Sequence, residues 1–282
     1  MQRGLFILFL KLEALRMKKQ NERISLLVLN LMPNKLETEN QLNNVFSGNN
    51  KYLEKTYCYP GTHQFKSIQP KEVQERYYRF DELKDNSYDG LIITGAPVEH
   101  IPFQEVDYWE EFCEIIDWSK QHCKKVLFLC WAAQAGMYYV AKVPKKVCFE
   151  KKFGIYKLNV QYADHELLDG MGENIWMPFS RYSTTDKRDL SDDRFNLIAD
   201  SPDVGPVIVE TKDQKFTFVT GHPEYETKML DKEYWRDINK GKKIKKPANY
   251  YAGQNNRIIN TWTIHSQRLF SNWLKGVKNF KA

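Results

Sequence analysis

Short apolar runs recur along the chain, and segments with a helical spacing of apolar residues lie between them. The earlier runs are nearly continuous rather than alternating, which is typical of parallel strands covered on both faces. Helical spacing appears around residues 42–46 and again over residues 109–119. This alternation predicts an α/β fold with a doubly wound, mostly parallel sheet flanked by helices. The predicted strands are residues 24–32, 91–94, 126–130, 195–199, 207–209 and 216–220.

The ends of four predicted strands carry polar or small residues that suit a site. They are residues 30–33, residues 94–96, Cys130 and residues 220–222. In a doubly wound sheet, active sites form at the carboxyl ends of the strands. We therefore expect these four segments to meet at one edge of the sheet.

Residues 23–282 contain no repeat, low-complexity tract or long Pro/Gly/Ser linker, so we expect one domain there. Residues 1–22 form an N-terminal extension whose apolar stretch, residues 5–10, is far too short to span a membrane. Charged residues follow it without a small-residue cleavage site, which disfavours a secretory signal. An alternative is that translation starts at Met17, which would make residues 1–16 a mis-called extension.

Composition indicates an ordinary globular protein. The chain has 282 residues, 42% of them hydrophobic, and its net charge of +6 is spread among nearly as many acids as bases. No zinc-finger spacing, aromatic RNA-binding signature or basic helix favours a nucleic-acid partner. The cysteine number is odd and includes no C-x-x-C, which disfavours disulfides and structural zinc and favours the reducing cytoplasm. The cysteines are Cys58, Cys113, Cys123, Cys130 and Cys148.

Cys130 has the pattern of a nucleophile elbow. It ends the apolar run of residues 126–129 and precedes the small, helix-compatible residues 131–136. A helix that starts there points its first N–H groups and the positive end of its dipole at the cysteine. We expect such a thiol to lose its proton more easily than free cysteine.

His222 and Glu224 directly follow a later predicted strand. The histidine can take a proton from the thiol, and the carboxylate can orient the histidine. Cysteine, histidine and glutamate at strand ends form the constellation of thiol acyl transfer. The other histidines show no metal-ligand spacing, so we expect no metal site. They are His63, His100, His122, His165 and His265.

The sequence Cys-Trp-Ala-Ala-Gln at residues 130–134, with His-Pro-Glu at residues 222–224, resembles the class I glutamine amidotransferase-like superfamily, which has a flavodoxin-like fold. Ala132 stands where that superfamily has glycine, which weighs against glutamine hydrolysis. A finer resemblance, from about residue 24 to residue 273, is to the homoserine O-acyltransferase (MetA-type) family. The segments that carry it are residues 30–41 (NLMPNKLETENQ), 94–97 (TGAP), 130–132 (CWA), 180–182 (SRY) and 220–225 (TGHPEY).

That resemblance implies roles for six side chains. Cys130 would carry the acyl group, His222 would act as acid and base, and Glu224 would orient it. Lys151, Ser180 and Arg236 match positions that the family uses to bind the acceptor. The expected donor is a thioester, acetyl-CoA, as a co-substrate with no further cofactor.

The chemistry of the residues agrees with a thioester donor. Transfer from a thioester to an alcohol divides into two steps if a cysteine takes the acyl group first, because thioester exchange is nearly balanced in free energy. The backbone N–H of Trp131, with that of Ala96 in the loop after residue 94, is expected to bind the developing oxyanion. Arg236 could pair bidentately with a carboxylate of the acceptor.

Glu99 bears on the donor. By the resemblance, glutamate at this position marks enzymes that use acetyl-CoA, and glycine marks those that use succinyl-CoA. A fixed carboxylate beside the acyl site would repel the free carboxylate of a succinyl group and fill its space. Acetyl-CoA is therefore the expected donor.

Three functions remain open. The first is an O-acetyltransferase that acts on L-homoserine, in methionine biosynthesis, or on L-serine, in cysteine biosynthesis. Serine stays open because this chain has a shorter segment before its first strand than typical members, and short members are regarded as serine O-acetyltransferases. The second is an amidase with the same triad, and the third is a non-enzymatic binding module. The resemblance also implies a homodimer, small-molecule substrates and no membrane partner.

Overall fold

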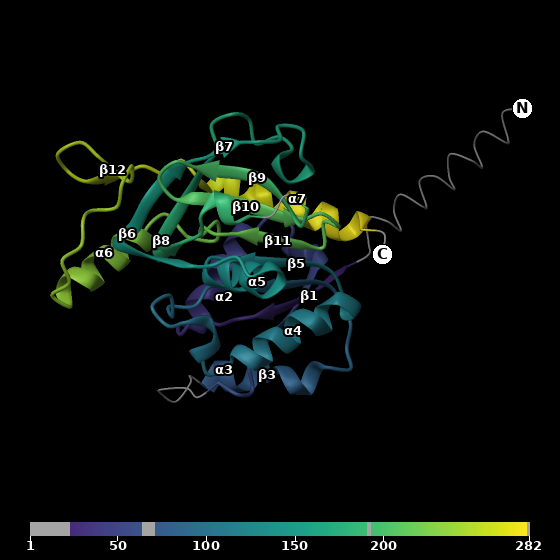
Figure 1. Cartoon of the computed structure of the whole chain (residues 1–282). Helices are drawn as coiled ribbons and strands as arrows, with labels where there is room; N and C mark the ends of the chain where they lie inside the picture. The colour runs from purple at the N-terminus through teal and green to yellow at the C-terminus, as the bar shows by residue number, and fades with distance from the viewer. Residues whose placement is uncertain (1–22, 64–70, 191–192, 281–282) are drawn as a thin grey trace, which may run out of the picture.

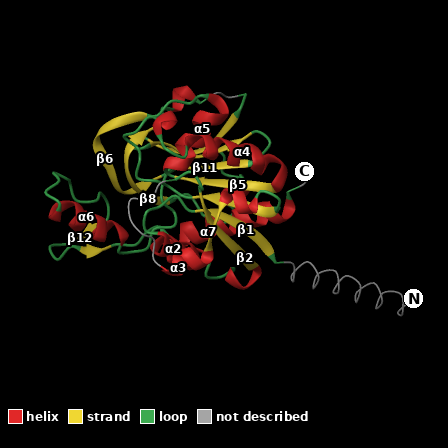
Figure 2. Ribbon diagram, turned by 90° about the horizontal axis from the view of Figure 1, so that it is seen from below, coloured by secondary structure: helices red, strands yellow, loops and turns green. Residues whose placement is uncertain are grey.

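The computed structural model describes residues 23–63, 71–190 and 193–280. The prediction for residues 1–22 lies outside this part. A central sheet dominates the fold, and helices cover both of its faces (Figures 1 and 2). Within the described residues the sheet has nine strands, in the spatial order β3 (Tyr77–Arg79), β2 (Leu53–Tyr59), β1 (Ile24–Leu29), β4 (Tyr88–Ile93), β5 (Cys123–Leu129), β11 (Phe216–Val219), β10 (Gly205–Thr211), β9 (Phe195–Ser201) and β7 (Asn159–Val160).

The prediction of a doubly wound, mostly parallel sheet is confirmed. The strands from β3 to β11 in spatial order all pair in parallel. β10, β9 and β7 extend the β11 edge with antiparallel pairs. The short connection between β10 and β11 explains the change, because a parallel pair needs a crossover of a dozen or more residues.

The helices on the two faces of the sheet pack into two apolar clusters (Figure 2). α2 (Lys35–Val45) and α7 (Thr263–Asn279) share one apolar cluster with Leu26 and Val28 of β1. α4 (Trp109–His122) and α5 (Trp131–Ala141) share the opposite cluster with Leu27 of the same strand. Successive side chains of a strand point to opposite faces, so a continuous apolar run fills both clusters.

A smaller layer lies beyond the ends of these strands and was not predicted from the sequence. β6 (Lys146–Lys157) and β8 (Trp176–Thr184) form an antiparallel ribbon, and α6 (Met229–Asn239) and the β12–β13 hairpin (Tyr251–Ala252, Arg257–Ile258) lie at the same end of the molecule (Figure 1). Their apolar cluster includes Phe153, Leu230 and Trp262. The backbone N–H of His222 donates to the carbonyl of Pro178, at 2.8 Å, which joins β8 to the end of β11.

The remaining short elements connect these layers. They are α3 (Lys71–Arg76) and the 3₁₀ turns Asn50–Tyr52, Phe80–Leu83, Phe103–Glu105, Glu166–Leu168 and Lys187–Asp189. All five cysteines are free. None of the helices in the described residues is long and apolar enough to cross a membrane.

The α7 side of the sheet depends on Trp273, which is fully buried beside Gly90 of β4. We expect Trp273→Ala to lower the free energy of unfolding by about 3–5 kcal/mol, because a large cavity would remain under α7. Chemical denaturation measures this. Ile264→Ala, on the same helix but 78% exposed, should stay within about 0.5 kcal/mol of the wild type. Equal losses for the two variants would contradict this packing.

Candidate active site

Cys130 lies at the turn between β5 and α5, where the sequence predicts a nucleophile elbow. Its φ of 49° and ψ of −112° put a residue other than glycine in a strained region of backbone space. Two contacts hold it there: its N–H donates to the carbonyl of Val219, at 2.8 Å, and its carbonyl accepts from the N–H of Ala133, at 3.1 Å. The thiol is therefore delivered to the start of α5 by both its own strand and the neighbouring one.

His222 and Glu224 form a buried pair at the end of β11. Nδ1 of His222 donates to Oε1 of Glu224 over 2.7 Å, so Nε2 is left for another partner. Burial by itself lowers the pKa of His222. The charges of Cys130 and Glu224, with hydrogen bonds to both side chains, outweigh burial and raise this pKa well above its usual value. The histidine therefore favours its protonated form while Cys130 carries a negative charge.

The loop after β4 closes the site from the other side. A Cβ added to Gly95 would lie 3.2 Å from Cβ of Cys130 and 3.4 Å from Cε1 of His222, so a larger residue here would contact both side chains. Ala96 and Trp131, the two predicted oxyanion donors, line the same cavity as Cys130. Trp131 is the first residue of α5, so its N–H has no acceptor within the helix.

One cavity of about 260 Å³ brings nearly all of the predicted site residues together. It is lined by Cys130 and His222, by the predicted acceptor-binding residues Lys151, Ser180 and Arg236, and by Glu99. These side chains come from β6, β8, α6 and the segments after β4, β5 and β11. Their convergence supports the predicted site, while the role of each residue stays a prediction.

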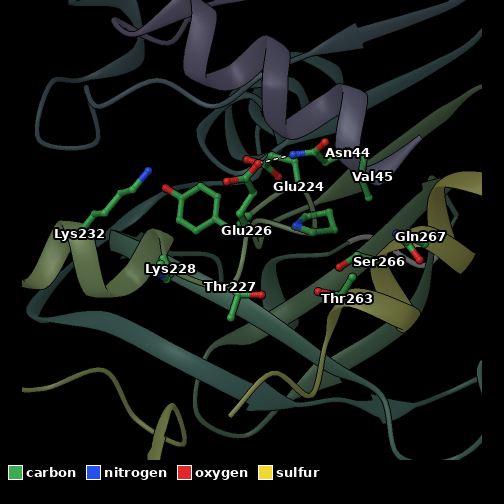
Figure 3. Close-up of a pocket in the computed structure, with 12 residues that line it drawn as sticks. Asn44, Val45, Glu224, Glu226, Thr227, Lys228, Lys232, Thr263, Ser266 and Gln267 are labelled. Atoms are coloured by element: carbon green, nitrogen blue, oxygen red, sulfur yellow. Dashed lines mark hydrogen bonds between the residues drawn. The ribbon is translucent and has the colours of Figure 1, made fainter. Parts of the chain in front are cut away.

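Glu224 lies behind His222 and lines a second cavity, of about 380 Å³ (Figure 3). α2 contributes Asn44 to this cavity and α7 contributes Ser266. The side chain of Asn44 donates to Glu226, the contact drawn as a dashed line. Tyr225 lines both cavities, whereas Glu224 lines only the second one.

The three predicted acceptor-binding residues meet at a carboxylate that sequence reasoning missed, Glu233 of α6. Its Oε2 accepts from the Ser180 hydroxyl at 2.5 Å and from Nζ of Lys151 at 3.1 Å. Arg236 approaches the same oxygen at 3.6 Å. Burial raises the pKa of Glu233, but the charge of Lys151 and hydrogen bonds from Ser180 and Tyr225 outweigh burial and hold it below its usual value.

Asp237, one helical turn further along α6, was also missed. Its carboxylate contacts Lys151 at 3.3 Å, Arg236 at 3.1 Å and Lys242 at 3.5 Å. A signal for both acids exists in the sequence, because residues 233 and 237 lie four apart and share one helix face beside Arg236. Acidic side chains next to a basic one are common on exposed helices, so this signal could not be told from a surface ion pair.

Arg181 is a buried cation next to Ser180. It is 2% exposed, lines the cavity of Cys130 and donates to the carbonyls of Ser183 and Val204, the latter at 2.8 Å. Burial lowers the pKa of Arg181, and the charge of Cys130 opposes that effect. A guanidinium held by carbonyl groups keeps its positive charge available to an anion in the cavity.

Lys35 fixes the loop between β1 and α2, which supplies Met32 and Pro33 to the cavity. Its Nζ donates to the carbonyl of Asn30 at 2.7 Å, and burial lowers its pKa to about 8. The hydroxyl of Thr94, at the end of β4, accepts from the N–H of Leu31 at 2.8 Å. The ends of β1 and β4 are thus joined beside the site. Within the described residues, no group of three or more histidine, cysteine or acidic side chains is arranged to hold a metal ion.

The close fit of Gly95 generates a prediction. Gly95→Ala should slow alkylation of Cys130 by iodoacetamide by about tenfold, because the new methyl group would lie 3.2 Å from Cβ of Cys130 and would displace the thiol from its position beside His222. Peptide mass spectrometry of timed samples measures the rate. Gly48→Ala is the control, since a Cβ at Gly48 would meet no atom within 4 Å. Equal alkylation rates for the two variants would show that Gly95 does not set the geometry.

A second prediction concerns the charge of His222. The wild-type imidazole should keep its proton as the pH rises through about 6.5, the ordinary histidine value. Cys130→Ala and Glu224→Gln each remove a negative charge that raises this pKa, so each variant should lose the proton at lower pH. NMR titration of the ring measures the shift. Cys113→Ala, which removes another free cysteine, should leave the titration unchanged, and no shift in either site variant would contradict the electrostatic account.

Solved structures similar to this one share its fold at low sequence identity. A glutamine amidotransferase from Thermotoga maritima superposes with a TM-score of 0.56 and 13% identity, over 92% of this chain and 99% of that one. Another, from Methylobacillus flagellatus, gives a TM-score of 0.56 and 11% identity, over 90% and 95% of the two chains. The prediction of a class I glutamine amidotransferase-like fold is confirmed.

Relatives of higher sequence identity are named for an activity other than glutamine amidotransfer. The chain is 41% identical over 254 residues to the homoserine O-acetyltransferase of Thermotoga petrophila, covering 89% of this chain and 83% of that protein. It is 40% identical over 268 residues to the homoserine O-acetyltransferase of Desulfitobacterium hafniense, covering 93% and 87%. The profile of a family described as homoserine O-succinyltransferase matches residues 8–279. The chain therefore belongs to the homoserine O-succinyltransferase family and is an acyltransferase.

Proposed function

We propose that this acyltransferase moves an acetyl group from acetyl-CoA to the side-chain hydroxyl of L-homoserine, through an acyl group held on Cys130. The observation that carries the proposal is one cavity in which a strained cysteine, a histidine and a cluster of charged side chains meet. Relatives named homoserine O-acetyltransferase support the acceptor and the acetyl group. The reaction is a step of methionine biosynthesis.

In the first half-reaction, the Cys130 thiolate attacks the thioester carbonyl. The bond to Sγ forms first and gives a tetrahedral oxyanion. When this intermediate collapses, the C–S bond to CoA breaks and His222 gives its proton to the departing CoA thiolate. The backbone N–H groups of Trp131 and Ala96 are the proposed donors to the intermediate oxyanion. The raised pKa of His222 suits this step, because the imidazolium is ready to act as an acid.

Acylation then prepares the histidine for the second half-reaction. The charge of Cys130 is one of the influences that raise the pKa of His222. Once Sγ carries the acetyl group this charge is gone, so the pKa of His222 falls and the neutral imidazole can accept a proton. The hydroxyl of the acceptor gives its proton to Nε2 and attacks the acyl carbonyl, and the Cys130 thiolate leaves. The loss of the negative charge on Cys130 thus changes His222 from an acid in the first half-reaction to a base in the second.

The acceptor site has an excess of positive charge that suits an amino acid. Three cationic side chains, Lys151, Arg236 and Lys242, face two carboxylates, Glu233 and Asp237. Arg236 has a side chain that is 51% exposed, so its guanidinium can receive a carboxylate from the substrate. L-serine offers the same carboxylate and a hydroxyl one methylene closer to it, and remains the alternative acceptor.

Activity with separate substrate pairs tests the proposal. Release of free CoA should be fastest with acetyl-CoA and L-homoserine, and it should require Cys130. L-serine is one methylene shorter than L-homoserine, so we expect kcat/KM for homoserine to exceed that for serine by roughly 10–200-fold. Cys130→Ala should abolish the release. Faster release of CoA with L-serine than with L-homoserine would assign the enzyme to cysteine biosynthesis. Equal release by Cys130→Ala and the wild type would contradict the mechanism.

Glu99 generates a separate prediction about the donor. Glu99→Gly should shift the ratio of kcat/KM values toward succinyl-CoA by roughly 100-fold, because like charges placed together cost several kcal/mol. Glu99→Gln keeps the size of the side chain and removes its charge, so it separates repulsion from lack of space. Steady-state kinetics with both donors measures the ratio. If the ratio of kcat/KM values for the two donors were unchanged in both variants, Glu99 would have no role in donor selection.

A further inference from the structure

Tyr225 joins the catalytic histidine to the acceptor-side cluster. Its ring stacks on the imidazole of His222, with centroids 4.1 Å apart and planes inclined by 20°. Its hydroxyl donates to Oε1 of Glu233 at 2.8 Å. The side chain is 6% exposed, and it lines the cavity that contains Cys130. One buried tyrosine therefore contacts both the base and the carboxylate at the centre of the cluster.

The two oxygens of Glu233 face different partners. Oε1 accepts from Tyr225, while Oε2 accepts from Ser180 at 2.5 Å and from Lys151 at 3.1 Å. A substrate that displaces Lys151 or Ser180 from Oε2 therefore changes the charge on the carboxylate to which the Tyr225 hydroxyl donates. Burial, followed by the charges of Glu233 and Glu224, raises the pKa of Tyr225, so its phenol stays protonated and remains a donor.

The backbone of Tyr225 is fixed independently of its hydroxyl. Its carbonyl accepts from the indole N–H of Trp262 at 2.9 Å, and its N–H donates to the carbonyl of His222 at 3.1 Å. The His222 ring is held at its edge by Glu224 and on its face by Tyr225. Loss of the hydroxyl would leave the stack in place and remove only its anchor to Glu233.

We propose that Tyr225 is a positioning residue for the second half-reaction, in which it aligns the His222 ring with the acceptor hydroxyl through its hydrogen bond to Glu233. This inference rests on the proposed function. Formation of the acyl-enzyme needs the thiolate and the imidazolium but no acceptor, so it does not require the link to Glu233. Transfer to the acceptor needs Nε2 aimed at a hydroxyl that the Glu233 cluster holds. The two half-reactions should therefore respond differently to loss of the phenol hydroxyl.

Separate measurement of the two half-reactions of the full-length enzyme tests this inference. Acetyl-CoA alone gives a burst of free CoA whose rate reports acylation, and L-homoserine added to the isolated acyl-enzyme gives the rate of transfer. For Tyr225→Phe we expect a burst rate within about twofold of the wild type. Transfer should slow roughly 10–100-fold, the factor expected for loss of a hydrogen bond to a charged group.

Tyr250→Phe is the matched control. Tyr250 is fully buried in the same apolar cluster. Its hydroxyl donates to the carbonyl of Thr227 at 2.5 Å and accepts from the N–H of Asp231 at 3.2 Å, so its hydrogen bonds are to backbone groups and not to the side chains of His222 or Glu233. Its loss should affect thermal stability without separating the two rates. Glu233→Gln should slow transfer, and Tyr225→Phe should add little in that background because their shared bond is already weakened. The pH profile of transfer should also shift in Tyr225→Phe, which a purely structural role would not cause.

Three results would overturn the inference. Equal slowing of both half-reactions in Tyr225→Phe would show that the tyrosine holds His222 for every step. Unchanged rates would show that stacking alone suffices. If the wild type gave no burst that depends on Cys130, the proposed function would fail and this inference would fail with it, an outcome distinct from the other two.

Discussion

The turn at Cys130 is the constraint on which the rest of the site depends. A residue other than glycine with φ of 49° costs about 1–3 kcal/mol and persists only where the surroundings determine it. Here β5 lies between β4 and β11, and the N–H of Cys130 is bonded to Val219 of β11. The resulting position of the Cys130 side chain favours a glycine opposite, because a Cβ at Gly95 would lie only 3.2 Å from Cβ of Cys130. The strained backbone at Cys130, the order of the strands and the glycine at position 95 therefore depend on one another.

Buried charges provide the second layer of the site. One group, with Cys130, His222 and Glu224, sets the protonation of the proposed base. A second group, around Glu233, contains the cations proposed to bind the acceptor. In these groups His222 and Glu224 are buried and paired with each other, and Lys151 and Glu233 likewise, as buried charges must be. Tyr225 is the contact between them. The proposed catalytic residues and the proposed acceptor-binding residues thus lie next to each other and have no side chain in common.

The sequence predicted the parts of the fold whose signal is local. Continuous apolar runs identified β1, β4 and β5, because a strand buried on both faces has no polar positions, and the order of strand ends brought Cys130 and His222 together. β2 was missed because its Glu54, Lys55 and Thr56 interrupt the apolar run. The β6–β8 ribbon was missed because only three of the 12 residues of β6 are buried, so its sequence has no continuous apolar run. Glu233 was missed because its partners Ser180 and Lys151 are distant in sequence. Tyr225 is near His222 and Glu233 in sequence, but its ring stack and hydrogen bond depend on side-chain orientation, which spacing does not reveal. The family resemblance predicted the positions of Lys151, Ser180 and Arg236, and the fold brings them to one cavity.

The most direct test of the account is the mass of the peptide that contains Cys130 after incubation of the enzyme with acetyl-CoA alone, and again after addition of L-homoserine. The account predicts one acetyl group on Cys130, absent from the other cysteines, that disappears when O-acetylhomoserine forms and at the same rate. Formation of product while Cys130 stays unmodified, or an acetyl group that homoserine does not remove, would contradict transfer through this cysteine.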